Sequence, residues 1–360
     1  MPVPALFEPL ILRGVTARNR IWLAPMCQYS CFDHDGMPND WHLVNLGQHA
    51  AGGFGLVMTE ATAVVPEGRI SPEDTGIWSD AHIEPWRRIA DFIRGQGAVA
   101  GMQLAHAGRK GSTWAPFADG EGTVPVERGG WQAVGPSELA FEGYDVPREM
   151  TTDEVAALPQ AFADAAVRAD RAGFDVVEVH GAHGYLIHEF LSPLANQRTD
   201  QYGGSFDNRT RLVLEIVDAV RQVWDKTLFV RLSASDWADG GWNVEETAQL
   251  GALLKQHDVD LLDISSGGAV AHQKIDIGPG YQVPFAREVR EVSGLPVSAV
   301  GLITEPAQAE QVLEGGSADV VMLGRVAIRE PAWPLRAAHE LGVPPASAPY
   351  PPQHRRGAWR

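Results

Sequence analysis

Two histidines and a tyrosine follow a short apolar run in the middle of the chain. His180, His183 and Tyr185 come directly after Val176–Val179, a run typical of a buried strand. Imidazole and phenol groups donate hydrogen bonds, and both can transfer protons. A buried strand that ends in these side chains therefore predicts a catalytic site at its carboxyl end.

The same histidines are also compatible with a zinc site. In that alternative, a TIM-barrel hydrolase would bind Zn²⁺ through His180 and His183, with His106 or Glu178 as a further ligand. No His-x-His pair marks the first strand, and a metal would leave the polar groups described below unexplained. We therefore expect no metal at this site.

Eight apolar runs recur along the chain, and helical patterns separate most of them. They are Ile21–Ala24, Leu56–Glu60, Val99–Leu104, Val176–Val179, Phe229–Leu232, Leu261–Ile264, Pro296–Val300 and Val320–Leu323. Each run is rich in Val, Ile and Leu rather than alternating, as in parallel strands that are covered on both faces. The pattern predicts an α/β fold, a (β/α)8 TIM barrel, formed by one domain over residues 1–360.

Capping residues mark several of the expected helices. Thr151 and Glu154 form a capping box, and we expect Pro159 to open the main helix after it. Asn208 and Asn243 are expected to cap two later helices. The apolar faces of these helices should pack on the outside of the barrel.

Two connections are long for a compact barrel. Residues 105–150 follow the third strand and residues 265–284 follow the sixth. Loops after barrel strands lie at the carboxyl face, where ligands bind. We expect both loops to cap that face, with 105–150 as a lid or capping insertion.

The composition excludes several classes of partner. The chain has 29 Lys and Arg against 46 Asp and Glu, a net charge of −17, which argues against nucleic acid or an anionic membrane. It contains no apolar run of about 18 residues and no basic-then-apolar leader. Cys27 and Cys31 are too few for a disulfide framework. We expect a cytoplasmic protein that acts on a small molecule.

The ends of the last two strands indicate the kind of ligand. Val300 and Gly301 end the seventh run, and Gly324 and Arg325 follow the eighth. Glycine lets backbone N–H groups approach a ligand closely, and a guanidinium binds phosphate oxygens in pairs. TIM barrels often bind phosphate at these two loops, so we predict a phosphate site here.

Two polar side chains on other strands suit a flat heterocycle. Gln103 offers a donor and an acceptor in one plane, and Arg231 lies within the fifth strand, where a buried guanidinium needs a partner. A salt bridge to a neighbouring carboxylate such as Glu60 is the alternative for Arg231. Because a phosphate site is predicted nearby, we favour the anionic edge of a cofactor.

Six motifs together resemble the Old Yellow Enzyme family of flavin ene-reductases. In chain order they are APMCQYS from Ala24, EATAV from Glu60, QLAHAGRK from Gln103, HGAHGYL from His180, NQRTDQYGGS from Asn196 and LGR from Leu323. The similarity extends from about Leu6 to the C-terminus. Cys27 resembles the bacterial branch that includes NADPH dehydrogenases and xenobiotic reductases.

The resemblance implies a role for each matching position. Non-covalent FMN would contact Ala24, Pro25, Met26, Cys27, Ala61, Gln103 at the pyrimidine edge, and Arg231 at N1 and the C2 carbonyl. The cofactor-binding set continues with Val300, Gly301, Gly324 and Arg325, of which the glycines and the arginine would hold the phosphate. Substrate would contact Tyr29, His180 and His183, with Tyr185 as the proton donor.

The implied activity is an FMN-dependent NADPH oxidoreductase, an ene-reductase. Its substrates would be the activated C=C bonds of α,β-unsaturated carbonyl, maleimide or nitro compounds. Hydride would pass from N5 of reduced FMN to the β-carbon, and Tyr185 would protonate the α-carbon. A non-catalytic flavin-binding protein stays open beside the zinc hydrolase, as do the physiological substrate and the choice between NADPH and NADH.

Two further predictions concern Cys27 and the tail. A cysteine in an apolar strand is most often a small hydrophobe rather than a nucleophile, and the resemblance implies that Cys27 tunes the flavin potential. The resemblance also implies that residues 345–360 reach the active site of a neighbouring subunit in a homodimer or a dimer of dimers. We favour Arg356 over Arg355 for that contact.

Overall fold

The computed structural model describes residues 3–359, and its centre is a closed barrel of eight parallel strands. The strands are β3 (Ile21–Leu23), β4 (Leu56–Ala63), β5 (Val99–Ala105), β8 (Val176–Gly181), β9 (Thr227–Ser233), β10 (Leu261–Ser265), β11 (Val297–Ala299) and β12 (Val320–Leu323). They pair in chain order, and β12 closes on β3. The predicted (β/α)8 barrel and its eight strands are therefore confirmed.

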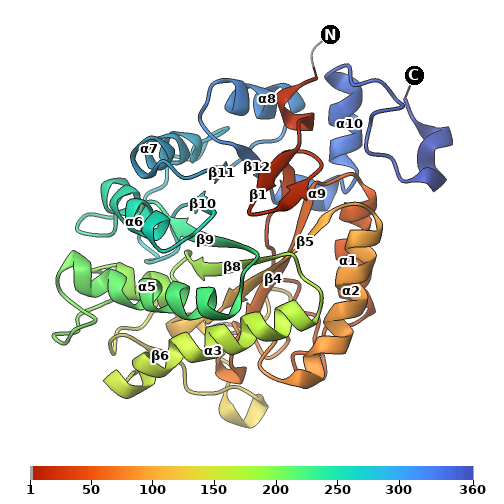
Figure 1. The fold of residues 1–360 in the computed structure, drawn as a ribbon. Helices are drawn as coiled ribbons and strands as arrows, with labels where there is room; N and C mark the ends of the chain where they lie inside the picture. Colours follow the sequence, from red (N-terminus) through yellow and green to blue (C-terminus); the bar gives the residue numbers. More distant parts are fainter. Residues whose placement is uncertain (1–2, 360) are drawn as a thin grey trace.

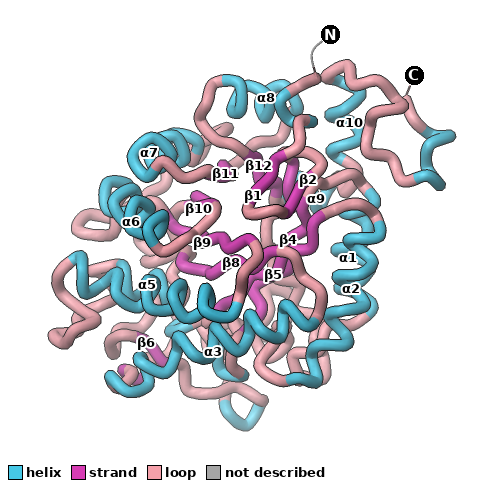
Figure 2. Tube along the Cα trace, in the orientation of Figure 1, coloured by secondary structure: helices cyan, strands magenta, loops and turns pink. Residues whose placement is uncertain are grey.

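Helices surround the strands on the outside, as Figure 2 shows by colour. They are α1 (Asp40–Ala51), α2 (Ile83–Gly95), α3 (Thr152–Arg171), α4 (Leu186–Leu191), α5 (Phe206–Val223), α6 (Val244–Gln256), α7 (Val283–Ser293), α8 (Pro306–Glu314), α9 (Arg325–Arg329) and α10 (Trp333–Glu340). Their buried faces join one continuous apolar core with the outward-facing side chains of the strands. None of the described helices combines the length and the apolar composition that a bilayer crossing requires.

Two of the predicted helix starts need correction. The capping box of Thr151 and Glu154 is present, but Pro159 lies inside α3 and does not open it. A single proline removes one backbone donor, and this helix has a complete N-cap and a long buried face that compensate for the loss. The cap of α5 is Ser205 rather than Asn208: the Ser205 side chain accepts a hydrogen bond from the Asn208 amide. Asn243 caps α6 as predicted.

A hairpin at the amino end of the barrel was not predicted. Strands β1 (Leu10–Leu12) and β2 (Val15–Ala17) pair antiparallel in front of the barrel in Figure 1. Their apolar side chains pack against a second cluster inside the barrel, in which the rings of Trp22 and Phe229 stack at 5.6 Å between centroids. The hairpin therefore closes the end of the barrel opposite the strand carboxyl ends.

The connection between β5 and α3 contains only short elements. These are the 3-10 turns η4 (Gly108–Lys110) and η5 (Val126–Arg128) and the short strands β6 (Val134–Gly135) and β7 (Arg148–Glu149). The connection between β10 and α7 contains no helix or strand. Both loops lie after barrel strands, on the carboxyl side.

Candidate active site

A cavity of about 330 Å³ lies at the carboxyl ends of the strands, within the size range of small-molecule sites. Nine residues of the predicted cofactor and substrate set line it: Ala24, Pro25, Met26, His183, Arg231, Val300, Gly301, Gly324 and Arg325. They come from strands far apart in the chain. The barrel brings them together because parallel strands end on the same face.

Other predicted residues gather around a small apolar cluster that includes Ala61 and Ala105. The side chains of Cys27, Tyr29 and Tyr185 pack against it. The ring of His180 lies 5.3 Å from that of Tyr185 and 5.2 Å from that of His183, between centroids. His180 and His183 thus connect the tyrosines to the cavity.

The predicted phosphate site includes a glycine that the backbone geometry requires. Gly301 has φ +108°, and a Cβ at this position would lie 2.7 Å from Nε2 of Gln282, so a side chain here would be both strained and crowded. Arg325 begins α9 with an exposed side chain, and Arg329 on the same helix also lines the cavity. Two cations four positions apart on one helix face the same space.

Arg231 forms a buried ion pair, but not with Glu60. Its Nε lies 2.8 Å from Oδ2 of Asp263, and the two residues stand side by side on β9 and β10. Ser298 also donates a hydrogen bond to Asp263. Within residues 3–359 the terminal nitrogens of Arg231 have no hydrogen-bond partner, although the side chain is only 6% exposed and lines the cavity. A buried guanidinium with free donors suits an anionic or carbonyl edge of a ligand.

The side chain of Gln103 is positioned by a hydrogen bond to Glu178 on the neighbouring strand. Its Nε2 donates a hydrogen bond of 2.8 Å to Oε1 of Glu178, and both side chains are buried. Burial, and next the charge of Asp263, raise the pKa of Glu178 to about 8. The amide oxygen of Gln103 accepts no hydrogen bond from the described residues, so it is available to a ligand N–H.

His183 is fixed through both its backbone and its ring. Its amide donates to Oγ of Ser233 at 2.9 Å, and its Nε2 lies 2.8 Å from Oγ of Ser265. Oγ of Ser265 also lies 3.4 Å from Oε1 of Gln282, to which the hydroxyl of Ser266 donates at 2.6 Å.

Both histidines are neutral at physiological pH. Burial, and next the charge of Arg231, lower the pKa of His180 and of His183 well below the usual value. Nδ1 of His180 is buried without a hydrogen-bond partner in the described chain. Each ring therefore offers one N–H donor and no competing charge.

Tyr185 is a protonated phenol. Burial raises its pKa well above the usual value. The residue precedes α4, and its ring lies beside His180. It can therefore give a proton to a group that becomes strongly basic during a reaction.

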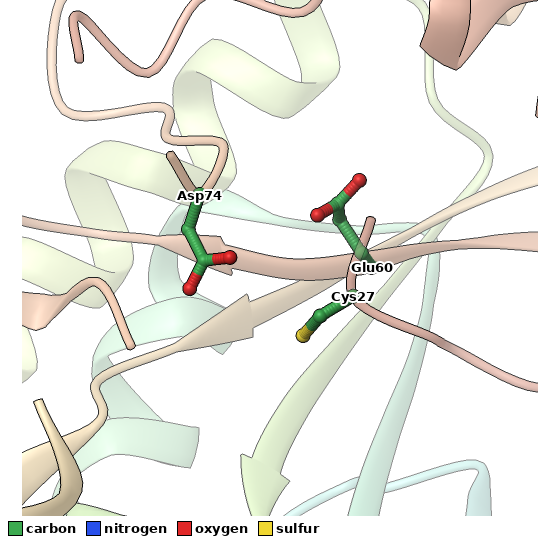
Figure 3. Close-up of side chains that lie close together, drawn as sticks. All are labelled: Cys27, Glu60 and Asp74. Carbon is green, nitrogen blue, oxygen red and sulfur yellow. The ribbon is translucent and has the colours of Figure 1, made fainter. Parts of the chain in front are cut away.

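Cys27 lies in a buried acidic cluster (Figure 3). Its sulfur and one carboxylate oxygen each of Glu60 and Asp74 lie within 4.8 Å of one another. Burial, and next the charges of Asp74 and Glu60, raise the pKa of the Cys27 thiol well above its usual value. The thiolate needed for nucleophilic attack is thus disfavoured, and the geometry supports the interpretation of Cys27 as a protonated side chain.

The proposed zinc ligands are not arranged around the histidine pair. Nδ1 of His106 accepts the Gly108 amide at 3.1 Å, and Glu178 is bonded to Gln103. The described side chains whose geometry suits a metal are Cys27, Glu60 and Asp74, which include neither histidine.

The tail lies on the outside of its own barrel. The ring of Trp359 stacks on His339 of α10 at 5.4 Å between centroids. Arg355 and Arg356 are exposed in the 3-10 turn η6 (Pro352–Gly357), at the edge of the molecule in Figure 1. Arg356 therefore lies outside the cavity of its own chain.

Sequence reasoning missed Ser265, Gln282 and Arg329. Ser265 ends β10, and its position at a strand end was the available signal. Arg329 could have been found because it lies one helical turn after Arg325. The sequence around Gln282 did not indicate a place in the site, since that place depends on its close contact with Gly301.

The barrel and its site define a class of protein: a TIM barrel with a ligand cavity at the carboxyl ends of its strands, beside two histidines and a tyrosine. Residues 5–343 match the NADH:flavin oxidoreductase / NADH oxidase family. The chain belongs to this family. It is therefore an oxidoreductase that uses FMN and a reduced nicotinamide nucleotide.

Individual relatives agree with this assignment. The chain is 48% identical over 356 residues to an NADPH dehydrogenase of Geobacillus thermodenitrificans (strain NG80-2), covering 99% of this chain and 98% of the relative. The structure of the old yellow enzyme homologue from Zymomonas mobilis has a TM-score of 0.77 and 29% identity, covering 97% of this chain and 99% of that one. The predicted membership in the Old Yellow Enzyme family is confirmed.

One larger structure also shares the fold. A 2-naphthoyl-CoA reductase complex has a TM-score of 0.85 and 26% identity, and the match covers 96% of this chain. The chain spans about half of that reductase, 53% of its length. The alternative of a zinc-dependent hydrolase is wrong, because the chain is a flavin oxidoreductase.

Proposed function

We propose that the chain is an FMN-dependent NADPH oxidoreductase that reduces the activated C=C bond of α,β-unsaturated carbonyl, maleimide or nitro compounds. The observation that carries the proposal is the grouping of His180, His183 and Tyr185, with ring centroids 5.2 and 5.3 Å apart beside the cavity. The 48% identity to the NADPH dehydrogenase of Geobacillus thermodenitrificans supports NADPH as the reductant.

The residues present fit FMN. The unpartnered guanidinium nitrogens of Arg231 face the cavity, where they suit N1 and the C2 carbonyl of a flavin. The free amide oxygen of Gln103 suits the flavin N3–H. Gly301, Gly324 and Arg325 line the other end of the cavity, where they would hold the phosphate. FMN held by these residues and reduced by NADPH would supply the hydride for the alkene.

The histidines bind and polarise the substrate. As hydride arrives, negative charge develops on the substrate carbonyl or nitro oxygen, and the N–H groups of His180 and His183 stabilise it. Because both rings are neutral, each carries one N–H that can donate to this oxygen. Tyr29, on the same apolar cluster as Tyr185, would contact the substrate from the loop that follows β3.

Tyr185 completes the reduction. Its O–H bond breaks, the electron pair stays on the phenol oxygen, and the proton goes to the α-carbon. The phenolate recovers a proton from solvent before the next turnover. The raised pKa of Tyr185 keeps the donor form available throughout the neutral range.

A two-stage anaerobic titration tests the function. Purified protein with bound FMN is titrated with NADPH, which should bleach the flavin absorbance, and 2-cyclohexenone is then added, which should restore it. A non-catalytic flavin-binding protein would keep oxidised flavin in the presence of NADPH. Flavin that is bleached by NADPH and not restored by any activated alkene would contradict the proposed substrate class.

Replacing Cys27 should change the flavin potential and leave turnover largely intact. Cys27 follows Met26 at the cavity wall and is a protonated thiol, so it acts as a neutral neighbour rather than as a nucleophile. We expect Cys27→Ala to shift the midpoint potential, measured by dye-coupled reduction. Cys31→Ala is the matched control, because Cys31 is also a free cysteine of the segment after β3 but does not pack against the apolar cluster that Cys27, Tyr29 and Tyr185 contact. Loss of all turnover in Cys27→Ala with FMN still bound would contradict this role.

The tail is proposed to complete the active site of a neighbouring subunit in a homodimer or a dimer of dimers. Support comes from the exposure of Arg355 and Arg356 at the edge of the barrel, while Trp359 anchors the segment to α10. Truncation after Gln353 should raise KM for the alkene. Arg356→Ala should reproduce the effect, and Arg355→Ala should not. Kinetics of the truncated protein identical to those of the full chain would argue against a shared site.

Both cysteines are free, which favours a reducing compartment such as the cytoplasm.

A further inference from the structure

Lys110 lies half-buried beside the loop that follows β8. It ends η4, directly after β5, where its sequence context suggests a solvated charge or a contact with the NADPH phosphates. Instead its Nζ donates hydrogen bonds to the carbonyl of His183 at 2.8 Å and to the carbonyl of Gly268 at 3.1 Å. A lysine that donates to two backbone carbonyls links the two segments to which those carbonyls belong.

The two linked segments touch through their backbones. A Cβ on Gly184 would lie 1.9 Å from the carbonyl oxygen of Gly268, so no side chain separates the loop after β8 from the loop after β10. The carbonyls of His183 and Gly268 both point at Lys110, and buried carbonyl oxygens need donors. Arg109 makes a neighbouring link, because its Nη2 donates to the carbonyl of Ala269 at 2.5 Å.

The same ammonium group lies against two aromatic rings. Nζ of Lys110 is 5.0 Å from the ring centroid of Tyr185 and 4.6 Å from that of Phe141, which comes from the long insertion after β5. A cation near an aromatic ring is attracted by its electron density. The attraction increases as a phenol becomes a phenolate, because the ring then carries negative charge.

We propose that Lys110 is a positioning residue for the proton-transfer step: it holds His183 against the loop after β10 and stabilises the charge that develops on Tyr185. The inference rests on the proposed function, in which Tyr185 gives its proton to the α-carbon. It assigns a role to a lysine that contacts neither of the predicted phosphate-binding loops.

Other charges surround this lysine and bear on its pH dependence. Burial lowers the pKa of Lys110 to about 8, with Glu189 of α4 opposing the shift and Arg109 adding to it. Burial raises the pKa of Glu189 to about 8, so it titrates in the same range. His180 and His183 stay neutral there, because their pKa values are lowered. Below about pH 8 Lys110 is charged, and above it the charge is lost.

The first test measures the two half-reactions separately by anaerobic stopped flow. We expect Lys110→Met to slow reoxidation of reduced enzyme by 2-cyclohexenone by roughly tenfold to a hundredfold. Reduction by NADPH should be slowed less, because it does not use the Tyr185 proton. Lys110→Arg should recover part of the rate. Lys226→Met is the matched control, since Lys226 also bonds a backbone carbonyl and lies 5.2 Å from a ring, that of Trp224, outside the cavity.

The second test uses the wild-type pH profile. The rate of reoxidation should fall as pH rises through about 8 in the wild type and in Glu189→Gln. It should stay low and flat in Lys110→Met. A fall that disappears in Glu189→Gln and persists in Lys110→Met would assign the titration to Glu189 and overturn the proposal.

A third measurement does not depend on alkene reduction. Hydrogen exchange of the backbone amides in residues 266–270 should be faster in Lys110→Met than in the wild type and in Lys226→Met. Wild-type exchange together with a wild-type reoxidation rate in Lys110→Met would overturn the proposal. Wild-type enzyme that no activated alkene reoxidises would instead refute the proposed function, while the exchange data would still decide whether Lys110 links the two loops.

Discussion

Tyr185→Phe should slow reoxidation of the reduced enzyme by 2-cyclohexenone by roughly 10²- to 10⁴-fold, the usual contribution of a general acid. The substitution removes the phenol O–H and keeps the ring, which packs beside His180 and beneath Nζ of Lys110. Substrate should still bind through the two histidines. Because proton transfer to carbon would then depend on water, the loss should appear in the rate of reoxidation rather than in substrate affinity.

Reduction by NADPH provides the internal control for this variant. It involves no proton from Tyr185, so its rate should change far less than that of reoxidation. Tyr202→Phe is the matched external control: Tyr202 is a buried tyrosine whose hydroxyl donates to Glu215, on the outer side of the barrel. The test uses the enone rather than a nitroalkene. An unchanged rate with 2-cyclohexenone would show that another group donates the proton.

The barrel and the convergence of the site were predictable because each rests on a local pattern. Runs of Val, Ile and Leu indicate strands buried on both faces, and parallel strands end on one face whatever lies between them. Arg231 and Gly301 could therefore be assigned to one site although they lie on different strands. The closed barrel and the cavity that both residues line agree with that reasoning.

The partners of charged side chains could not be predicted in the same way. Arg231 pairs with Asp263 rather than Glu60 because the register of β9 and β10 sets these residues side by side, and register is a property of the closed barrel. The contacts of Lys110 were missed because its partners are backbone carbonyls, which have no signature in the sequence. The amino-terminal hairpin was missed because its strands are too short to show a period.

Arg231→Met should lower the free energy of unfolding by about 3–5 kcal/mol, because it leaves the Asp263 carboxylate buried without its cation. Asp263 is fully buried and would keep only the hydroxyl of Ser298 as a donor. The carboxylate must then stay ionised at high cost or take up a proton. Chemical denaturation of the apoprotein measures this effect without any contribution from the cofactor.

The double variant Arg231→Met with Asp263→Asn separates stability from cofactor binding. Asparagine removes the uncompensated charge and can still accept from Ser298, so most of the lost free energy should return. FMN affinity should stay reduced by roughly tenfold or more in both variants, since a hydrogen bond to a charged group contributes about 1.5–3 kcal/mol. Wild-type FMN affinity in the double variant would mean that Arg231 serves the barrel alone. If Arg231→Met is as stable as the wild type, removal of the guanidinium does not leave Asp263 as an uncompensated buried charge.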